Sequence, residues 1–196
     1  RVTVTEEARR QFKVGVQLLE DPAGPRYAEA YEAFRRAYAE SPTPRILSNL
    51  GLCAMRLERD GEAIAAYERY LREVDDIEAA ERQRIERDLE ALRSRSATIV
   101  VVARPAAGTL VDRRITASGA PPVNRYQVTE SPVTLVVHAG QHEVFLESGA
   151  RSSPTLSVVV AAGERKSVEV ALPPDAVGTE PAAPPPVSSP PPSPIA

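Results

Sequence analysis

The sequence predicts a multidomain α + β protein: an N-terminal α-solenoid, then a small β-sandwich, then a disordered Pro-rich tail. Three segments of different composition predict this architecture. Residues 1–96 are rich in Ala, Leu, Arg and Glu, and their apolar positions recur with helical spacing. Residues 97–172 are rich in Val and Thr and alternate between apolar and polar positions. Residues 173–196 are dominated by proline, which cannot build a core.

The helical segment contains an internal repeat. Ala30 and Phe34 in its first half recur as Ala63 and Tyr67, 33 residues later. Repeats of this length, each made of two helices, are typical of solenoids, in which neighbouring repeats bury a continuous core. The pattern therefore predicts two helical hairpins within residues 1–76.

Gly15 and Gly51 each interrupt a helical pattern upstream of these residues. Glycine in a helix interior costs about 1 kcal/mol relative to alanine, so a packing reason is expected. The simplest reason is a neighbouring helix that crosses too close for a side chain. We expect the two repeated alanines opposite the glycines, and the two aromatic residues in the wider gap one turn further on.

The stretch NLGLCAMRLERDGEAIAAYERYL, residues 49–71, resembles a tetratricopeptide (TPR) repeat. Its Leu50-Gly51 pair, Ala63 and Tyr67 match the Leu-Gly, small and aromatic positions of that family. An upstream repeat matches at Val14-Gly15, Ala30, Phe34, Ala37 and Pro42, although its turn, DPAGPRY (21–27), is longer than in the family. Residues 77–95 are expected to form a third, charged helix that caps the stack.

This resemblance implies a concave groove that binds a protein or peptide partner. The residues that would line the groove are Arg9, Phe12, Val16, Leu19, Arg45, Ser48, Leu52 and Met55. An apolar floor with arginines at one end suits an apolar segment or a chain terminus. The alternative is that these residues pack on the third helix and only stabilise the stack.

Charge, apolar runs and cysteine content argue against nucleic acid as a partner, against a membrane span and against an internal disulfide. The net charge of −3 implies no basic face and argues against nucleic acid. No apolar run approaches the roughly 18–20 residues of a membrane span. The single cysteine, Cys53, cannot form an internal disulfide and is expected to be a small buried hydrophobe.

Seven short runs with strand-like alternation follow the helices. They cover residues 98–103, 109–116, 124–129, 133–138, 142–147, 155–160 and 166–172. Glycine and proline lie between most of them, as is typical of turns. This spacing predicts a small β-sandwich.

Both histidines, His138 and His142, lie around Gly140 and are spaced like half a metal site. We expect a hairpin here, with an even loop that sets Val137 opposite His142 and places the aliphatic residues of both strands on one face. The two histidines then point to opposite faces and cannot share an ion, and a third histidine ligand is absent. We therefore expect surface or half-buried histidines, with no metal and no cofactor.

Residues 130–150, ESPVTLVVHAGQHEVFLESGA, followed by residues 158–172, are similar to the second half of PEGA domains. A Pro-led strand, a Gly turn, His142 at an aromatic-or-His position and the Gly163-Glu164 turn carry this likeness. The first half matches less well, since Pro-Ala-Ala-Gly stands where the family has Pro-Glu-Gly-Ala. The resemblance implies an Ig-like or transthyretin-like sandwich, typical of bacterial envelope proteins and without catalytic machinery.

These features predict a non-enzymatic scaffold of the bacterial cell envelope, periplasmic or otherwise extracytoplasmic, for which a membrane tether would lie outside this stretch. Its helices would bind a protein or peptide, its β-module would dock on a surface component, and its tail would act as a spacer. No motif for nucleophilic, phosphoryl-transfer or metal chemistry is present. The alternative is a module that binds glycan or cell-wall polysaccharide through the β-domain, with Tyr126 and Phe145 as stacking aromatics.

Overall fold

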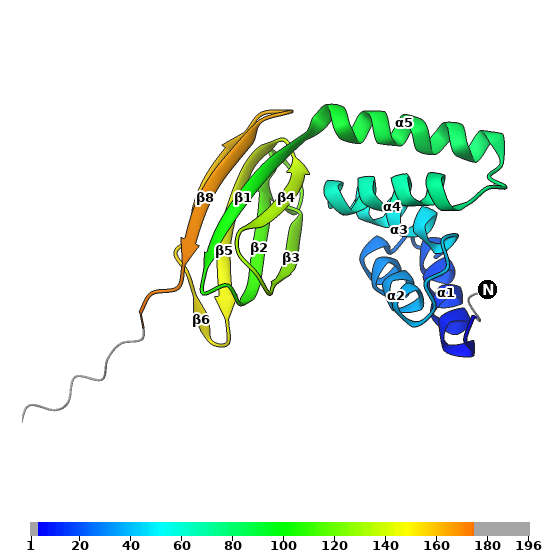
Figure 1. Cartoon of the computed structure of the whole chain (residues 1–196), viewed down its shortest axis with the longest axis horizontal. Helices are drawn as coiled ribbons and strands as arrows, with labels where there is room; N and C mark the ends of the chain where they lie inside the picture. The colour runs from blue at the N-terminus through cyan, green and yellow to red at the C-terminus, as the bar shows by residue number, and fades with distance from the viewer. Residues whose placement is uncertain (1–3, 175–196) are drawn as a thin grey trace, which may run out of the picture.

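The computed structural model describes residues 4–174, and it confirms the predicted order of helices followed by strands (Figure 1). The predicted tail, residues 173–196, lies outside the described residues from position 175 onward. The five helices are α1 (Glu6–Leu19), α2 (Tyr27–Glu40), α3 (Ile46–Arg56), α4 (Asp60–Glu73) and α5 (Ala79–Arg95).

The first four helices pack in sequence order, and α5 packs against α4. Thr5 caps α1, because its side chain accepts a hydrogen bond from the Ala8 N–H. The apolar residues of α5, namely Ile85, Leu89 and Leu92, are buried in the same core as those of the other helices. The charged fifth helix is therefore part of the helical unit and covers one end of its core.

Both helical glycines lie directly against aromatic rings. A Cβ atom added at Gly15 would lie 2.6 Å from Cε1 of Phe34, and one added at Gly51 would lie 2.5 Å from Cδ1 of Tyr67. Both rings are fully buried. The close approach that the glycines predict is therefore present, but the ring fills it and the repeated alanine does not. A flat ring can lie on a bare backbone, which makes glycine and aromatic residue a matched pair.

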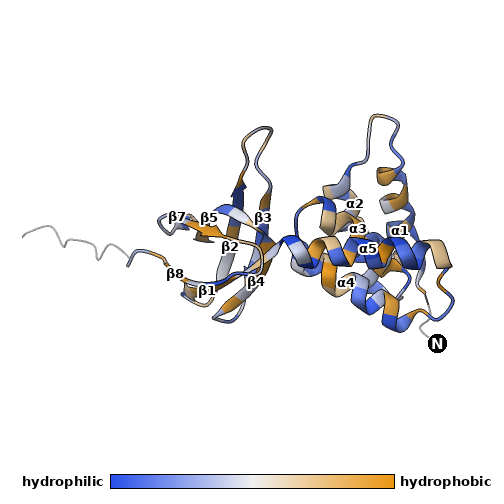
Figure 2. Ribbon diagram, turned by 90° about the horizontal axis from the view of Figure 1, so that it is seen from above, coloured by the Kyte–Doolittle hydropathy of each residue, from blue (hydrophilic) through white to orange (hydrophobic). Residues whose placement is uncertain are grey.

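The strands form two sheets that make two layers (Figure 2). All seven predicted runs form strands, and a two-residue strand is added. The strands are β1 (Ser96–Arg104), β2 (Gly108–Ile115), β3 (Val123–Val128), β4 (Val133–His138), β5 (Gly140–Ser148), β6 (Arg151–Ser152), β7 (Leu156–Val160) and β8 (Arg165–Ala171). One sheet has the order β4-β1-β8. The other has the order β3-β2-β5-β6, with β7 also paired to β5.

The predicted hairpin between β4 and β5 is wrong. Val137 lies opposite Ala97 of β1, and His142 lies opposite Arg114 of β2 and Val158 of β7, so the chain crosses between the sheets near Gly140. The alternating aliphatic residues of both strands nevertheless meet in one core between the layers. Alternation specifies which face of a strand is buried, and it leaves the hydrogen-bonded neighbour open.

The helical and β parts join without a linker. Helix α5 ends at Arg95 and strand β1 begins at Ser96 (Figure 1). Helix α4 also packs against β4, where a Cβ atom added at Gly61 would lie 3.0 Å from Cβ of Val136. The two parts therefore meet at a covalent junction and along a second, non-covalent contact.

Candidate functional site

The predicted groove residues of α1 are mostly engaged by the helical core. The Phe12 ring is tilted against Phe34, with 5.5 Å between the ring centroids. Val16 and Leu19 are half-buried and pack on the same core. Arg9 is exposed, and its guanidinium pairs with Glu6 at 2.6 Å. Helix α1 thus presents partly exposed apolar side chains and one locally neutralised arginine.

The predicted groove residues of α3 are arranged in a similar way. Met55 is half-buried against the core, and Leu52 is also half-buried. Ser48 is half-buried, and its hydroxyl donates to the Arg45 carbonyl at 3.4 Å. The Arg45 guanidinium contacts both carboxylate oxygens of Asp76 at 2.5 Å, in the loop between α4 and α5. The two arginines that were expected to mark one end of the groove are both paired with acidic neighbours.

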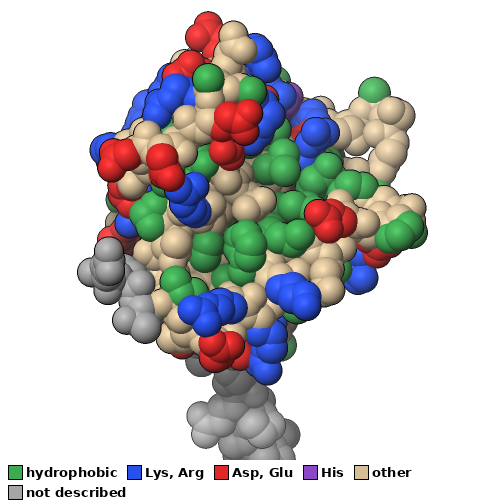
Figure 3. Space-filling model, turned by 90° about the vertical axis from the view of Figure 1, so that its right-hand side faces the viewer, with side chains coloured by type: hydrophobic (Ala, Val, Ile, Leu, Met, Phe, Trp, Pro, Cys, Tyr) green, Lys and Arg blue, Asp and Glu red, His purple; other side chains and the backbone are tan. Residues whose placement is uncertain are grey.

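Figure 1 shows α1 at the end of the helical unit away from the strands, and Figure 3 shows that end of the molecule from outside. Hydrophobic side chains gather near the middle of this face, with acidic and basic side chains around them (Figure 3). This distribution is compatible with an apolar contact surface that has a charged rim. Cys53 is a buried residue of α3, and burial raises the pKa of its thiol to about 12. It is therefore an inert packing residue.

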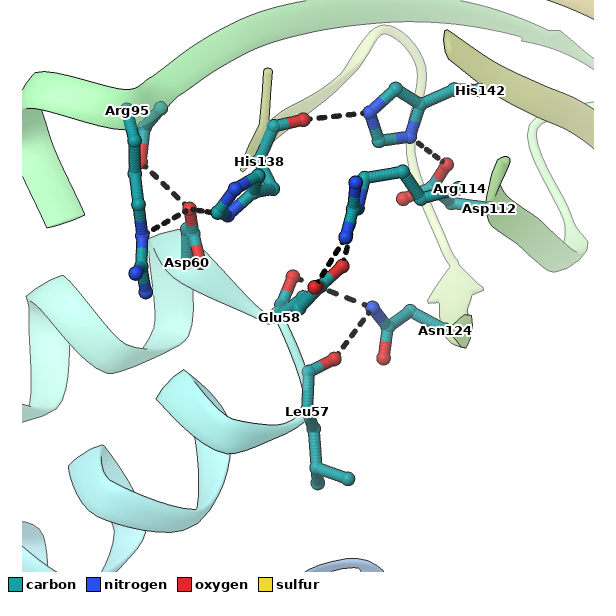
Figure 4. Close-up of polar contacts among 10 residues, drawn as sticks. Leu57, Glu58, Asp60, Arg95, Asp112, Arg114, Asn124, His138 and His142 are labelled. Atoms are coloured by element: carbon teal, nitrogen blue, oxygen red, sulfur yellow. Dashed lines mark hydrogen bonds and ion pairs between the residues drawn. The ribbon is translucent and has the colours of Figure 1, made fainter. Parts of the chain in front are cut away.

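Both predicted histidines lie at the junction between the helical and β parts (Figure 4). The prediction that His142 is a surface or half-buried residue is wrong, because its ring is only 1% exposed. Its Nδ1 atom lies 2.7 Å from Oδ1 of Asp112, and its Nε2 atom lies 2.7 Å from the His138 carbonyl. Burial lowers the pKa of His142, but the hydrogen bond to Asp112, the charge of Asp112 and the hydrogen bond to the His138 carbonyl together outweigh it, and the net shift is upward.

His138 is half-buried, and its ring points toward α4 and away from His142 (Figure 4). Its Nδ1 atom lies 3.5 Å from Oδ2 of Asp60, a carboxylate that is fully buried. The same Oδ2 atom lies 3.0 Å from Oγ of Ser96 and 3.9 Å from Nε of Arg95. Burial raises the pKa of Asp60.

Burial alone favours the protonated form of Asp60, because its polar neighbours act in the opposite direction. The Ser96 hydroxyl, which also lies 2.6 Å from the Leu92 carbonyl, donates to Oδ2 of Asp60 and lowers the pKa of that carboxyl, as do the nearby Arg95 and His138 side chains. Among the described residues, the other Asp60 oxygen, Nδ1 of His138 and Nε of Arg95 are buried without a hydrogen-bond partner. Three of the seven buried polar side-chain atoms without a partner in the described residues therefore lie together at this junction.

A second polar group ties the α3–α4 corner to the β part. The guanidinium of Arg114 contacts both carboxylate oxygens of Glu58 at 2.5 Å, and Asn124 donates to the Leu57 carbonyl at 3.2 Å (Figure 4). Burial acts to raise the pKa of Glu58, but its hydrogen bonds to Arg114 and the charges of the neighbouring basic groups together outweigh this and lower the pKa. Glu58 has a φ of 57°, an uncommon value for a residue with a side chain.

Sequence reasoning did not find this polar junction. Glu58, Asp60 and Arg95 all belong to a helical charge pattern that predicts solvated faces. Asp112 and Arg114 lie in a strand whose partner could not be read from its pattern. The available signal was Asp60 at the first position of α4, but it could not be told from an ordinary first-turn acidic residue.

The two aromatics of the alternative glycan site are half-buried and have arginines on their rings. The Arg59 guanidinium lies 4.8 Å from the Tyr126 centroid and 5.2 Å from the Tyr31 centroid. Arg113 lies 6.0 Å from the Phe145 centroid. The guanidinium groups therefore lie where a stacked sugar would compete for the ring faces.

No protein-family model and no curated protein matches this chain. Within residues 4–174, His, Cys, Asp and Glu side chains do not form a group of three or more that could hold a metal ion. In the same range, every helix is too short or too polar to span a membrane. The candidate sites are therefore the partly apolar face of α1 and α3 and the junction between the two parts.

Proposed function

We propose that this protein is a non-enzymatic scaffold of the bacterial cell envelope, located in the periplasm or elsewhere outside the cytoplasm. Its helical part would be a short α-solenoid of two TPR-like hairpins capped by α5. Its β part would be an Ig-like or transthyretin-like sandwich of the PEGA type. The helices would bind a protein or peptide, and the sandwich would dock on another envelope component.

The repeated glycine–aromatic contact supports the solenoid. Gly15 against Phe34 in the first hairpin and Gly51 against Tyr67 in the second are the same contact at equivalent positions of the repeat. Two hairpins that close on the same pair of residue types are expected of a stacked repeat. The burial of α5 against this stack supports its role as the terminal cap.

The observation that carries the binding proposal is the partly exposed apolar surface of α1 and α3. Phe12, Val16, Leu19, Leu52 and Met55 are all half-buried. Because the arginines beside them are neutralised by Glu6 and Asp76, the surface suits an apolar segment better than a chain-terminal carboxylate. The glycan alternative is less well supported, since Tyr126 and Phe145 do not offer free ring faces.

The test is capture from an envelope extract with the full chain immobilised. Leu52→Glu places a charge in the middle of the α1–α3 surface, and it should remove the bound protein while far-UV circular dichroism keeps the helical signal. Val159→Glu is the matched control, because Val159 is an apolar residue of the β part that is 60% exposed. This control should retain the partner.

Capture that is equal for both variants would contradict binding by α1 and α3. A partner that the Val159→Glu variant alone loses would place the contact on the β part. Recovery of polysaccharide, with binding insensitive to Leu52→Glu, would favour the glycan-binding alternative.

A further inference from the structure

The contact between α4 and β4 encloses a carboxyl group completely. Asp60 is the first residue of α4, and it is 0% exposed. Its polar neighbours come from both parts of the chain, with His138 at the end of β4 and Arg95 at the end of α5 (Figure 4). The next residue of α4, Gly61, lies directly on Val136 of β4. The Asp60 carboxyl is therefore buried where the helical and β parts touch.

The groups around Asp60, apart from His138, compensate a negative charge incompletely. The Ser96 hydroxyl of β1 bonds to one carboxylate oxygen at 3.0 Å, and among the described residues the other oxygen is buried without a partner. Nε of Arg95 lies 3.9 Å away, which is beyond hydrogen-bond distance, and that side chain is 37% exposed. Glu58, the nearby acidic residue of the α3–α4 corner, adds negative charge, although Arg114 of β2 neutralises it.

His138 is the group that can supply the missing charge. Its Nδ1 atom lies 3.5 Å from Oδ2 of Asp60 and, within residues 4–174, is buried without a hydrogen-bond partner. The backbone at this position is held from β5, because Nε2 of His142 donates to the His138 carbonyl at 2.7 Å. The two unpartnered groups thus face each other across the boundary between the helical and β parts (Figure 4).

The proton content of the Asp60–His138 pair determines whether the contact encloses a net charge. With one extra proton the pair is neutral, either as carboxyl and imidazole or as carboxylate and imidazolium. Without it, a buried carboxylate remains beside a neutral ring. Burial raises the pKa of Asp60 although Ser96, Arg95 and His138 act to lower it, so the enclosed negative charge is unfavourable. The N-terminus of α4 favours a negative charge here, but by less than burial disfavours it.

The direction of the pH effect follows from this. Two coupled groups release their protons in steps that belong to the pair. For a carboxyl–imidazole pair the upper step lies where imidazole ordinarily changes charge, between about pH 5 and 8. The contact is therefore favoured at the acidic end of this range and weakened as pH rises through the step.

We propose that Asp60 and His138 form a pH-dependent latch between the helical and β parts. The contact between α4 and β4 is closed while the pair holds its extra proton, and it opens when the proton is lost and the carboxylate becomes hydrated. The Glu58–Arg114 pair and the direct connection from α5 to β1 keep the two parts together, so opening turns one part relative to the other. This device is separate from the α1–α3 surface and needs no partner.

The test measures how often the contact opens, by labelling a cysteine placed beneath it. Val136→Cys sets a thiol under Gly61, and Val159→Cys, at a position of β7 that is 60% exposed, is the reference for the effect of pH on labelling itself. Cys53 is buried and stays unlabelled. We expect the ratio of the two labelling rates to rise by up to about tenfold between about pH 5.5 and 8, because a difference of one unit in proton affinity between closed and open forms corresponds to a tenfold change in opening.

Three substitutions in the labelled chains identify the groups responsible. Asp60→Asn keeps the size of the side chain but cannot ionise, so the ratio should stay low and constant. His138→Gln removes the imidazole at a partly exposed position, so the rise should move to lower pH, where Asp60 alone loses its proton. His142→Gln is the control, since it changes the other histidine, and it should leave the rise at its original pH. Circular dichroism checks that each variant is folded.

The proposal is overturned if the ratio stays constant over this pH range, or if the rise persists in Asp60→Asn. It is also overturned if His138→Gln leaves the rise unchanged. A rise that moves with His142→Gln would contradict it as well, because opening would then follow the stability of the β part as a whole.

Discussion

Gly51→Ala is the substitution that most directly tests how the helical hairpins close. The added Cβ atom would lie 2.5 Å from Cδ1 and Cε1 of Tyr67 and 3.0 Å from its Cγ. Ordinary carbon–carbon contact distances are about 3.5–4.0 Å, so the ring would have to move by roughly 1 Å. Because Cγ is itself in the overlap, rotation of the ring cannot relieve it, and the ring is fully buried.

Two effects of opposite sign determine how much Gly51→Ala changes the free energy of unfolding. Alanine in place of glycine should stabilise a helix interior by about 1 kcal/mol. Overpacking a core typically costs about 1–3 kcal/mol, and this overlap belongs near the upper end because the ring is enclosed. The net expectation is a loss of about 1–2 kcal/mol of unfolding free energy, measured by urea denaturation followed at 222 nm.

The double variant Gly51→Ala with Tyr67→Ala serves as the control for this explanation. Alanine at position 67 lacks Cγ, Cδ1 and Cε1, the three atoms that overlap, so the alanine at position 51 should cost much less in that background than in the original chain. Gly15→Ala should reproduce the single-variant loss through Phe34. If Gly51→Ala instead raised the unfolding free energy by about 1 kcal/mol, helix propensity would dominate and the ring would not require the glycine.

Three further outcomes concern the junction, each measured by denaturant titration over a pH series. Because the pKa of Asp60 is raised, the wild type should lose stability as pH rises from about 4 through the folded-state value, and Asp60→Asn should lack this loss. The raised pKa of His142, held by Asp112, stabilises the fold below about pH 6.5 and is lost as pH rises through the folded-state value; His142→Gln should flatten that slope. Glu58 has a lowered pKa, so its pairing with Arg114 stabilises above about pH 4.5 and is lost on further acidification; Glu58→Gln should cost about 1 kcal/mol at pH 7 and less at pH 3.

Local patterns were sufficient for most of the fold. The five helices and seven of the strands follow from apolar period and from turn residues, and Gly15 and Gly51 correctly indicated close approaches within the helical part. Buried positions on β4 and β5, such as Val137 and Val144, also follow from alternation. These features depend on neighbours in sequence, so a single sequence contains them.

Pairing between distant segments could not be read in the same way. Strand β4 is hydrogen-bonded to β1 rather than to β5. The alternation of the sequence could not show this, because two sheets with inward aliphatic faces satisfy that alternation as well as a hairpin does. His142 was misplaced for the same reason, since its partner Asp112 comes from a strand that only the topology brings near. The contact between Asp60 and His138 depends on how two separately predictable parts meet, and no local pattern describes it.

Because α5 runs directly into β1, a force applied to the helical part is transmitted to the first residues of that strand. Strand β1 is central in its sheet, and it runs parallel to β8 from the Thr98–Arg165 pair to the Arg104–Ala171 pair. Tension between the helical part and the chain after β8 would pull β1 at its first residues and β8 at its last. Such a load is applied along the ladder, so its hydrogen bonds are strained together rather than opened one by one. A pair of strands loaded in shear would therefore carry tension between the helical part and the chain after β8.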